Sequence, residues 1–148
     1  AQESRGLGDV YKRQGYTYMD SEQKDLGKQA DGRDRAGTGL AFPNTPKHSY
    51  SLWTSYHFTP KFTAGVGIYG QSEVVGNYAY SGNALIKRAI GGYTRFDAMA
   101  SYAYSRNVTL QLNVSNLFDK TYYGSTYTTH YATLANGRSA VLSANVKF

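Results

Sequence analysis

The chain has 148 residues, a formal net charge of +6 and a mean hydropathy of −0.54. It contains 15 tyrosines and 16 glycines but no cysteine, which excludes a disulfide scaffold and a thiolate metal site. No run of 18 apolar residues occurs, so a membrane-spanning helix is excluded. Membrane-spanning strands are not excluded, because their alternating polarity keeps mean hydropathy low.

Six segments alternate apolar and polar residues with the period of a β-strand, and helical periodicity is nearly absent. The clearest is the last, where Leu142, Ala144 and Val146 alternate with Ser143 and Asn145. Most segments exceed the length of about five or six residues that is common for strands in globular proteins, and they suit a tilted crossing of a bilayer. The pattern predicts strands over residues 15–23, 49–58, 62–69, 95–104, 108–115 and 140–148.

The connections between these segments alternate in length. Long polar stretches cover residues 24–45, 75–91 and 124–137, whereas short turns lie near Pro60 and Asn107. Successive antiparallel strands put alternate connections at opposite ends of a sheet, so all long loops share one end. This polarity is typical of outer-membrane barrels. The sequence therefore predicts an all-β fold of about six long antiparallel meander strands, forming part of a transmembrane β-barrel and, as a fragment, an open curved sheet.

In such a barrel one face of each strand meets lipid and the other lines the lumen. We expect Gln111 and Ser143 to face the lumen. We expect the apolar residues of the same strands to face lipid, namely Phe96, Ala98, Leu110, Leu112, Leu142 and Val146. Aromatic girdles at the two membrane surfaces explain the tyrosine excess, with members Tyr16, Tyr18, Tyr50, Tyr56, Tyr102 and Tyr104.

Three motifs, found in order, resemble the C-terminal barrel portion of TonB-dependent siderophore receptors. They are the proline motif at 44–48 (NTPKH), the block at 116–123 (NLFDKTYY) and a final strand that ends on Phe148. The resemblance implies a 22-stranded barrel in the bacterial outer membrane. It also implies an N-terminal plug and import of ferric siderophores with energy from an inner-membrane complex.

On this resemblance residues 15–148 form the C-terminal part of a receptor barrel. The partners it implies are a ferric siderophore and outer-membrane lipid. The plug and the TonB complex would act only through an N-terminal part that this chain lacks. Residues 1–14 break the alternation and are expected to be a non-native or disordered leader.

Motifs of other chemistries are weak in this chain. Gly65, Gly67 and Gly70 match a dinucleotide fingerprint, but they lie inside an alternating segment that no amphipathic helix follows. Glycines on the lumen face of a strand explain them better. His48, His57 and His130 lack the spacing of a metal site, and no serine-hydrolase elbow occurs. Neither an enzymatic activity nor a cofactor is expected.

Ligand contacts, if a polar ferric chelate is bound, belong in the long loops. Aromatic and basic side chains suit such a ligand. The candidates are Tyr78, Tyr80, Lys87, Arg88, Tyr127, His130, Tyr131 and Arg138. Two alternatives remain at this level: a small outer-membrane pore or adhesin, and a basic all-β module that binds nucleic acid. Six strands are too few for the first, and the aromatics do not cluster with basic residues as the second requires, so no nucleic-acid partner is expected.

Overall fold

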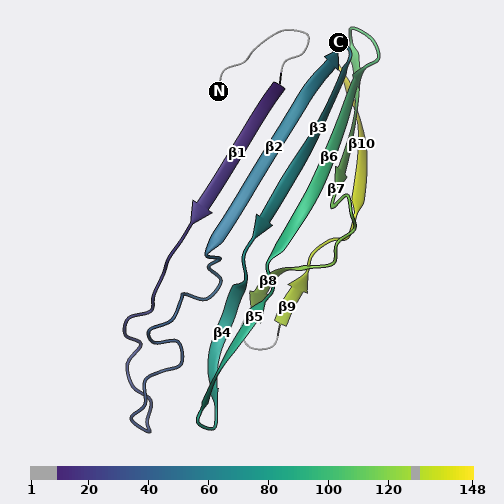
Figure 1. Ribbon diagram of the computed structural model, residues 1–148. Coiled ribbons are helices and arrows are strands. Elements are labelled where there is room, and N and C mark those ends of the chain that lie inside the picture. The colour runs from purple at the N-terminus through teal and green to yellow at the C-terminus, as the bar shows by residue number, and fades with distance from the viewer. Residues whose placement is uncertain (1–9, 128–130) are drawn as a thin grey trace.

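A six-stranded antiparallel sheet forms the body of the molecule (Figure 1). The structure is a computed structural model that describes residues 10–127 and 131–148. In spatial order the strands are β1 (Val10–Tyr18), β2 (His48–Thr59), β3 (Phe62–Gln71), β6 (Tyr93–Ala103), β7 (Val108–Ser115) and β10 (Ser139–Val146). The outer edges of β1 and β10 pair with no other strand among the described residues. The predicted all-β meander is confirmed.

Two small hairpins interrupt connections in which we predicted only loop. The first joins β4 (Val74–Ser81) to β5 (Ala84–Ile90), with Gly82 at a positive φ of 62° in its turn. The second joins β8 (Tyr123–Tyr127) to β9 (Tyr131–Leu134). Over the described residues no helix is long and apolar enough to span a membrane.

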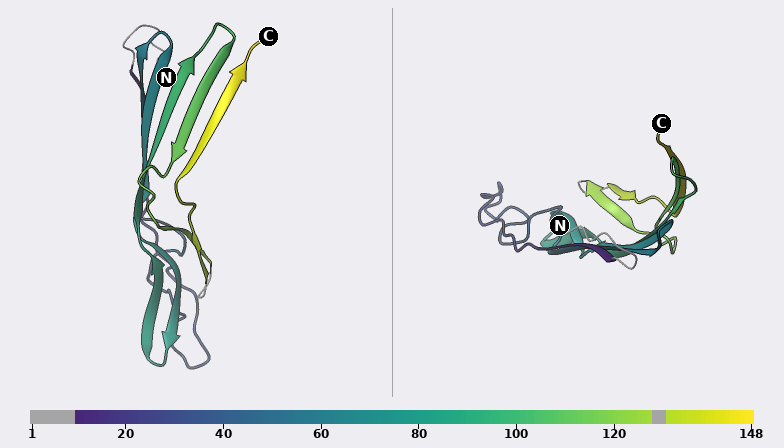
Figure 2. Two further views of the ribbon diagram at one scale, coloured as in Figure 1. Left: turned by 90° about the vertical axis from the view of Figure 1, so that its right-hand side faces the viewer. Right: turned by 90° about the horizontal axis from the view of Figure 1, so that it is seen from above.

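The register of the sheet sorts side chains onto two faces. Trp53 lies opposite Gly67, which lies opposite Asp97, whereas Leu52, Ile68 and Phe96 form the neighbouring row on the other face. Seen from above, the sheet curves into a trough, and the β8–β9 hairpin lies on its concave side (Figure 2). Tyr122, which leads into β8, stacks on Tyr93, whose side of β6 also carries Arg95 and Asp97. The polar face is therefore the concave one.

The convex face is mostly apolar and, among the described residues, largely exposed, although Phe118 packs edge-on against Phe96 at 5.3 Å between ring centroids. Leu142 is 72% exposed, and Leu110, Leu112 and Val66 are exposed as well. Ala100, Leu112 and Leu142 form one continuous row across β6, β7 and β10. The residues that we predicted to face lipid all lie on this face, and Gln111 and Ser143 lie on the other. An uncovered apolar face of this size is what a lipid-facing barrel wall requires.

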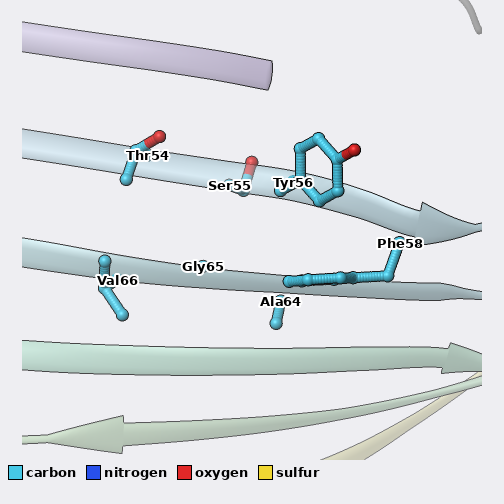
Figure 3. Close-up of a pocket in the computed structure, with 7 residues that line it drawn as sticks. All are labelled: Thr54, Ser55, Tyr56, Phe58, Ala64, Gly65 and Val66. Carbon is cyan, nitrogen blue, oxygen red and sulfur yellow. The ribbon is translucent and has the colours of Figure 1, made fainter. Parts of the chain in front are cut away.

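A shallow groove of about 210 Å³ marks the convex face near the turn that joins β2 and β3 (Figure 3). Phe58 packs edge-on against Tyr56 at 4.8 Å between ring centroids and lies 5.8 Å from Phe62. The groove is lined by Thr54, Ser55, Tyr56, Phe58, Ala64, Gly65 and Val66. Tyr56 and Tyr102, two of the predicted girdle residues, both lie toward this end of the sheet, and their place in a girdle stays a prediction.

The long and short connections lie at opposite ends of the sheet, as predicted (Figure 1). The turns after β2 and after β6 share one end with the C-terminal residue. The β1–β2 loop and the two hairpins share the other end. We refer to these as the turn end and the loop end.

The predicted bounds of the first strand are wrong at both ends. It runs over Val10–Tyr18 rather than residues 15–23, and Val10 pairs with Tyr56. Residues 10–14 lack alternation, since Lys12 and Gln14 fall on the apolar face, yet β2 is long enough to pair with them. Beyond Tyr18 the chain leaves the sheet after Met19 donates a backbone hydrogen bond to Lys47. That residues 1–14 form a non-native leader stays a prediction.

The glycines of the apparent dinucleotide fingerprint make room for aromatic rings. A Cβ on Gly67 would lie 2.5 Å from the indole of Trp53, and one on Gly65 would lie 3.0 Å from the same ring. Both glycines are on the concave face, as predicted. Gly70 is on the convex face instead, where the Tyr50 ring lies against it, so the prediction for this glycine is wrong. The segment lies within strand β3, and no helix follows it.

Candidate ligand-binding mouth

Three segments gather at the loop end of the sheet. Loop 1 comprises residues 19–47, the β4–β5 hairpin follows β3, and the third segment, residues 116–138, contains the β8–β9 hairpin. Strand β8 contacts both β4 and β5, so the third segment meets the second. The β8–β9 hairpin lies over the concave face, as Figure 2 shows. Together the three segments form the rim of the trough.

The buried apolar side chains of the described residues lie in this rim rather than in the sheet. They are Val74, Tyr78 and Ile90, all in the β4–β5 hairpin, and Tyr78 is only 8% exposed. Val74 pairs with Ile90 at the base of the hairpin, next to the sheet. The loop end therefore has a small hydrophobic core of its own, which fixes the hairpin to its neighbours.

Close contacts join all three segments. The Asn44 N–H donates a hydrogen bond of 2.7 Å to the Val75 carbonyl, linking loop 1 to β4. Gly37 lies against the Tyr78 ring, so a Cβ there would come within 3.2 Å of it, and its φ of 103° favours glycine. On the other side of β4, a Cβ on Gly76 would lie 2.5 Å from Thr126 Oγ1 in β8. Loop 1, β4 and β8 thus pack in that order.

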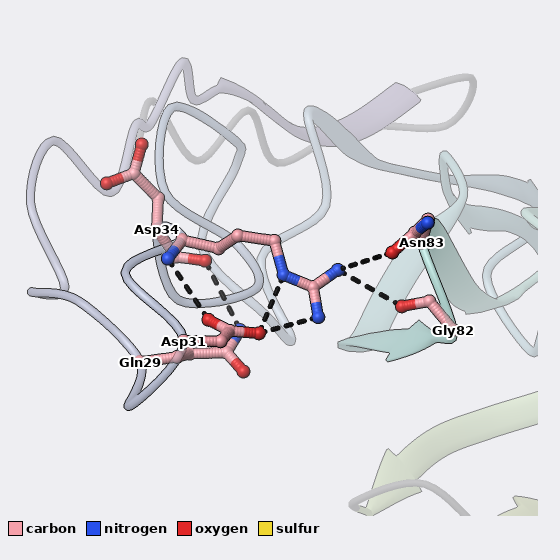
Figure 4. Close-up of polar contacts among 6 residues, drawn as sticks. Gln29, Asp31, Asp34, Gly82 and Asn83 are labelled. Atoms are coloured by element: carbon pink, nitrogen blue, oxygen red, sulfur yellow. Dashed lines mark hydrogen bonds and ion pairs between the residues drawn. The ribbon is translucent and has the colours of Figure 1, made fainter.

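Arg33 adds a polar link between loop 1 and the tip of the β4–β5 hairpin (Figure 4). Its Nη1 donates to the Gly82 carbonyl at 3.1 Å and to Asn83 Oδ1 at 3.3 Å. Its Nε donates to Asp31 Oδ2 at 2.7 Å, and the guanidinium lies 5.0 Å from the centroid of the Tyr80 ring. Hydrogen bonds from Arg33 hold the pKa of the Asp31 carboxyl below its ordinary value of 3.8.

The candidate ligand residues of the β4–β5 hairpin have different surroundings. Tyr78 is buried against loop 1, and Tyr80 lies under Arg33. Lys87 Nζ forms an ion pair of 2.5 Å with Glu73, and the hydrogen bond to that carboxylate raises the lysine pKa. Arg88 is exposed on β5. That these four residues contact a ligand stays a prediction.

The candidates of the third segment are exposed. Tyr127 and Tyr131 face each other across β8 and β9 and are 73% and 72% exposed. Arg138 is also exposed, and its backbone N–H donates to Asp119 Oδ1 at 2.7 Å. His130 lies outside the described residues. The structure brings Tyr127 and Tyr131 together, and ligand contact by this group likewise stays a prediction.

The other two histidines lie near strand ends, as predicted. The Tyr16 hydroxyl and His48 Nδ1 are 2.8 Å apart, and the Thr63 hydroxyl and His57 Nδ1 are 2.7 Å apart. Within the described part of the chain, no three His, Asp or Glu side chains are close enough together to hold a metal ion.

The NLFDK block forms a tight turn. Asn116 is 2% exposed and has a φ of 53°. Its side chain donates to the carbonyls of Lys120 and Asn136 and accepts from the Lys120 N–H, while its backbone N–H donates to Asp97. Asn116 therefore ties β6 and β7 to the segment that leads into β10.

A polar cluster on the concave face was not predicted from the sequence. Arg95 Nη2 pairs with Asp97 Oδ2 at 2.8 Å, and its guanidinium lies 5.0 Å from the Tyr69 ring centroid. Tyr93 stacks on Tyr122 at 4.1 Å between centroids. The cluster lies just below the rim of the trough. Its only sequence signal is the pair of charges at alternate positions of one strand.

Comparison with known proteins places this chain in a family. The model for the TonB dependent receptor-like β-barrel matches residues 6–117. The probable TonB-dependent siderophore receptor PiuA of Acinetobacter baumannii is 42% identical over 142 residues, covering 90% of this chain and 18% of that protein. The catecholate siderophore receptor Fiu of Escherichia coli is 32% identical over 127 residues, covering 80% of this chain and 16% of Fiu.

Solved structures agree with the sequence comparison. The crystal structure of PiuA from Acinetobacter baumannii superposes with a TM-score of 0.79 at 41% identity, covering 94% of this chain and 20% of that one. The ferric-catecholate import receptor Fiu from E. coli, in its closed form, superposes with a TM-score of 0.70 at 30% identity, covering 94% of this chain and 19% of Fiu. This chain thus spans about a fifth of the length of these relatives. It belongs to the TonB-dependent receptor-like β-barrel family, whose siderophore receptors are β-barrels of the bacterial outer membrane.

Proposed function

We propose that this chain forms part of the wall and the extracellular mouth of a transporter that imports ferric siderophores across the outer membrane. The observation that carries the proposal is the arrangement of the sheet. Its apolar convex face suits lipid, and its polar concave face leads to a rim with exposed Tyr127, Tyr131 and Arg138. Relatives that share this sheet are named siderophore receptors, which favours this function over a small pore, an adhesin or a nucleic-acid-binding module.

Transport of this kind needs parts outside this chain. A plug inside the barrel and the TonB complex would act through the N-terminal part of the receptor, and this segment would contribute wall and rim. We propose that its role is binding and passage of the chelate, without catalysis. Iron enters as cargo within the chelate, so no metal site is required of the protein itself.

The test uses the full-length receptor that contains this segment. Cells that lack their own siderophore receptors would express it and be grown under iron limitation with a ferric catecholate, ferric pyoverdine or ferric citrate. We expect growth on at least one chelate, and loss of that growth when TonB is deleted. Growth on none of them, with the receptor assembled at the surface, would contradict the proposal.

Variants then locate the binding surface. Replacing Tyr127, Tyr131 and Arg138 together by alanine should weaken chelate binding about tenfold or more, because a charge-assisted contact and two rings are lost. Arg106→Ala is the matched control, since Arg106 is exposed at the opposite, turn end of the sheet. Equal binding by the triple variant and the control would show that the three side chains are ordinary loop surface.

A further inference from the structure

Loop 1 contacts the β4–β5 hairpin in two places, one near the sheet and one at the tip of the hairpin. Near the sheet, Asn44 bonds to Val75 and Gly37 packs on Tyr78. Far from the sheet, the link is made by Arg33, whose partners at the hairpin tip are 49 and 50 residues away in sequence. We call Arg33, Asp31, Tyr80, Gly82 and Asn83 the Arg33 clasp; Figure 4 labels Asp31, Gly82 and Asn83 of this group.

The geometry of the clasp uses every part of a guanidinium. Nε and Nη2 bind one oxygen of Asp31, at 2.7 and 2.6 Å, which orients the side chain from within loop 1. Nη1 is thereby directed at the Gly82 carbonyl and at Asn83, while the guanidinium lies against Tyr80. A lysine has the same charge but only a single ammonium, so it cannot make these contacts at once.

We propose that Arg33 is a positioning residue of the mouth, which joins loop 1 and the β4–β5 hairpin into one body and thereby sets ligand affinity. The proposal rests on the proposed function and extends it. Without the clasp, the hairpin is anchored at its base by Val74, Tyr78 and Ile90, and its tip is released. A ligand that contacts the hairpin tip must then order the tip when it binds. The free energy spent on this ordering lowers the affinity.

Three variants of the full-length receptor test this. Arg33→Ala removes the clasp, and Arg33→Lys keeps the charge but not the geometry. Arg35→Ala is the control, because Arg35 is an exposed arginine of the same loop whose side chain forms no hydrogen bond or ion pair with another described residue. The first readout is amide hydrogen exchange of residues 80–86 without ligand. The second is the Kd for a ferric catecholate.

We expect exchange at residues 80–86 to be about tenfold faster in Arg33→Ala, since two hydrogen bonds and a ring contact are lost. Arg33→Lys should resemble Arg33→Ala, and Arg35→Ala should resemble the wild type. The Kd should rise about tenfold in both Arg33 variants, with surface expression unchanged.

Unchanged exchange in Arg33→Ala would overturn the clasp. Full recovery in Arg33→Lys would overturn it too, because charge alone would then account for the effect. Faster exchange with an unchanged Kd would overturn the positioning role. Failure of the wild type to bind any ferric chelate would instead count against the proposed function, and the exchange measurement would still decide whether the clasp exists.

Discussion

Trp53 of β2 lies against Gly67 of β3, so closely that a Cβ on the glycine would be 2.5 Å from the indole ring. The two residues are direct cross-strand partners on the concave face. The backbone of β3 is thus in contact with the ring, and the position tolerates only glycine without movement of Trp53.

Gly67→Val should therefore destabilise the receptor barrel by about 1 to 3 kcal/mol, the usual cost of overpacking. Urea unfolding of the full-length receptor, followed by heat-modifiable gel mobility, would measure the change. Gly91→Val is the control, because no atom lies within 4 Å of the Cβ it would add. Equal stability of the two variants would contradict the packing described for Trp53.

A charge on the convex face should cost far more than one on the concave face. Leu112→Arg should lower barrel stability by about 2 to 4 kcal/mol if the side chain lies near the bilayer midplane. Gln111→Arg, one residue away on the lumen side, should cost much less. Equal assembly defects of the two variants in outer-membrane fractions would contradict the assignment of faces.

Removal of the Asn116 side chain should loosen the turn between β7 and β10. Asn116→Ala leaves the Lys120 N–H and two carbonyls without their partner in a buried place, at a cost of about 1 to 3 kcal/mol. Thermal unfolding of the receptor would report this loss. Asn145→Ala, on the exposed surface of β10, should have no effect beyond the error of the measurement.

The Arg33 clasp should be insensitive to pH from about 5 to 8. Arg33 holds the pKa of Asp31 below 3.8, so Asp31 stabilises the folded loop above its unfolded-state pKa. That stabilisation is lost only as the pH falls through the lowered value. Hydrogen exchange of residues 80–86, corrected for the intrinsic rate at each pH, should thus give constant protection over this range. A drop in protection between pH 7 and 5 would show that another group controls the contact.

Residues 1–148 expressed alone should not form a stable monomer. Within residues 10–127 and 131–148, strands β1 and β10 each leave an edge unpaired, and unpaired backbone groups in a bilayer cost several kcal/mol each. In water the exposed convex face favours association. Detergent refolding followed by size-exclusion chromatography would check this: a compact monomer that binds a ferric chelate would contradict the prediction.

Sequence patterning was sufficient for much of the sheet. Strand β7 has the predicted bounds of 108–115, because its apolar and polar residues alternate between the two faces of the sheet along its whole length. The bounds predicted for β1 are wrong because Lys12 and Gln14 interrupt the alternation of apolar and polar residues. These residues still form strand, since their backbone pairs with β2. Pairing is a property of two segments, and neither one reveals it alone.

The rim was much harder to predict than the sheet. The sequence predicts a loop over residues 75–91, because the burial of Tyr78 depends on its contact with Gly37 of loop 1, which is distant in sequence. Arg33 gave no signal at all, since an arginine in a polar loop is commonplace and its partners are 49 or 50 residues away. The residue type alone does not show whether a tyrosine or arginine contacts a ligand or stabilises the loop in which it lies.

The aromatic rings at the two ends of β2 indicate where the two surfaces of the membrane cross the barrel wall. Ten residue steps separate His48, which contacts Tyr18, from Phe58, which contacts Tyr56. At about 3.3 Å per residue and a tilt of about 40°, this is about 25 Å, the height of the apolar band of an outer-membrane barrel. The β4–β5 hairpin then rises about 20 Å above the membrane surface, beyond two Debye lengths of about 8 Å at 0.15 M salt. The charge of the lipid headgroups is screened at that height, so a change from neutral to anionic lipid should leave the hairpin tip and its ligand unaffected.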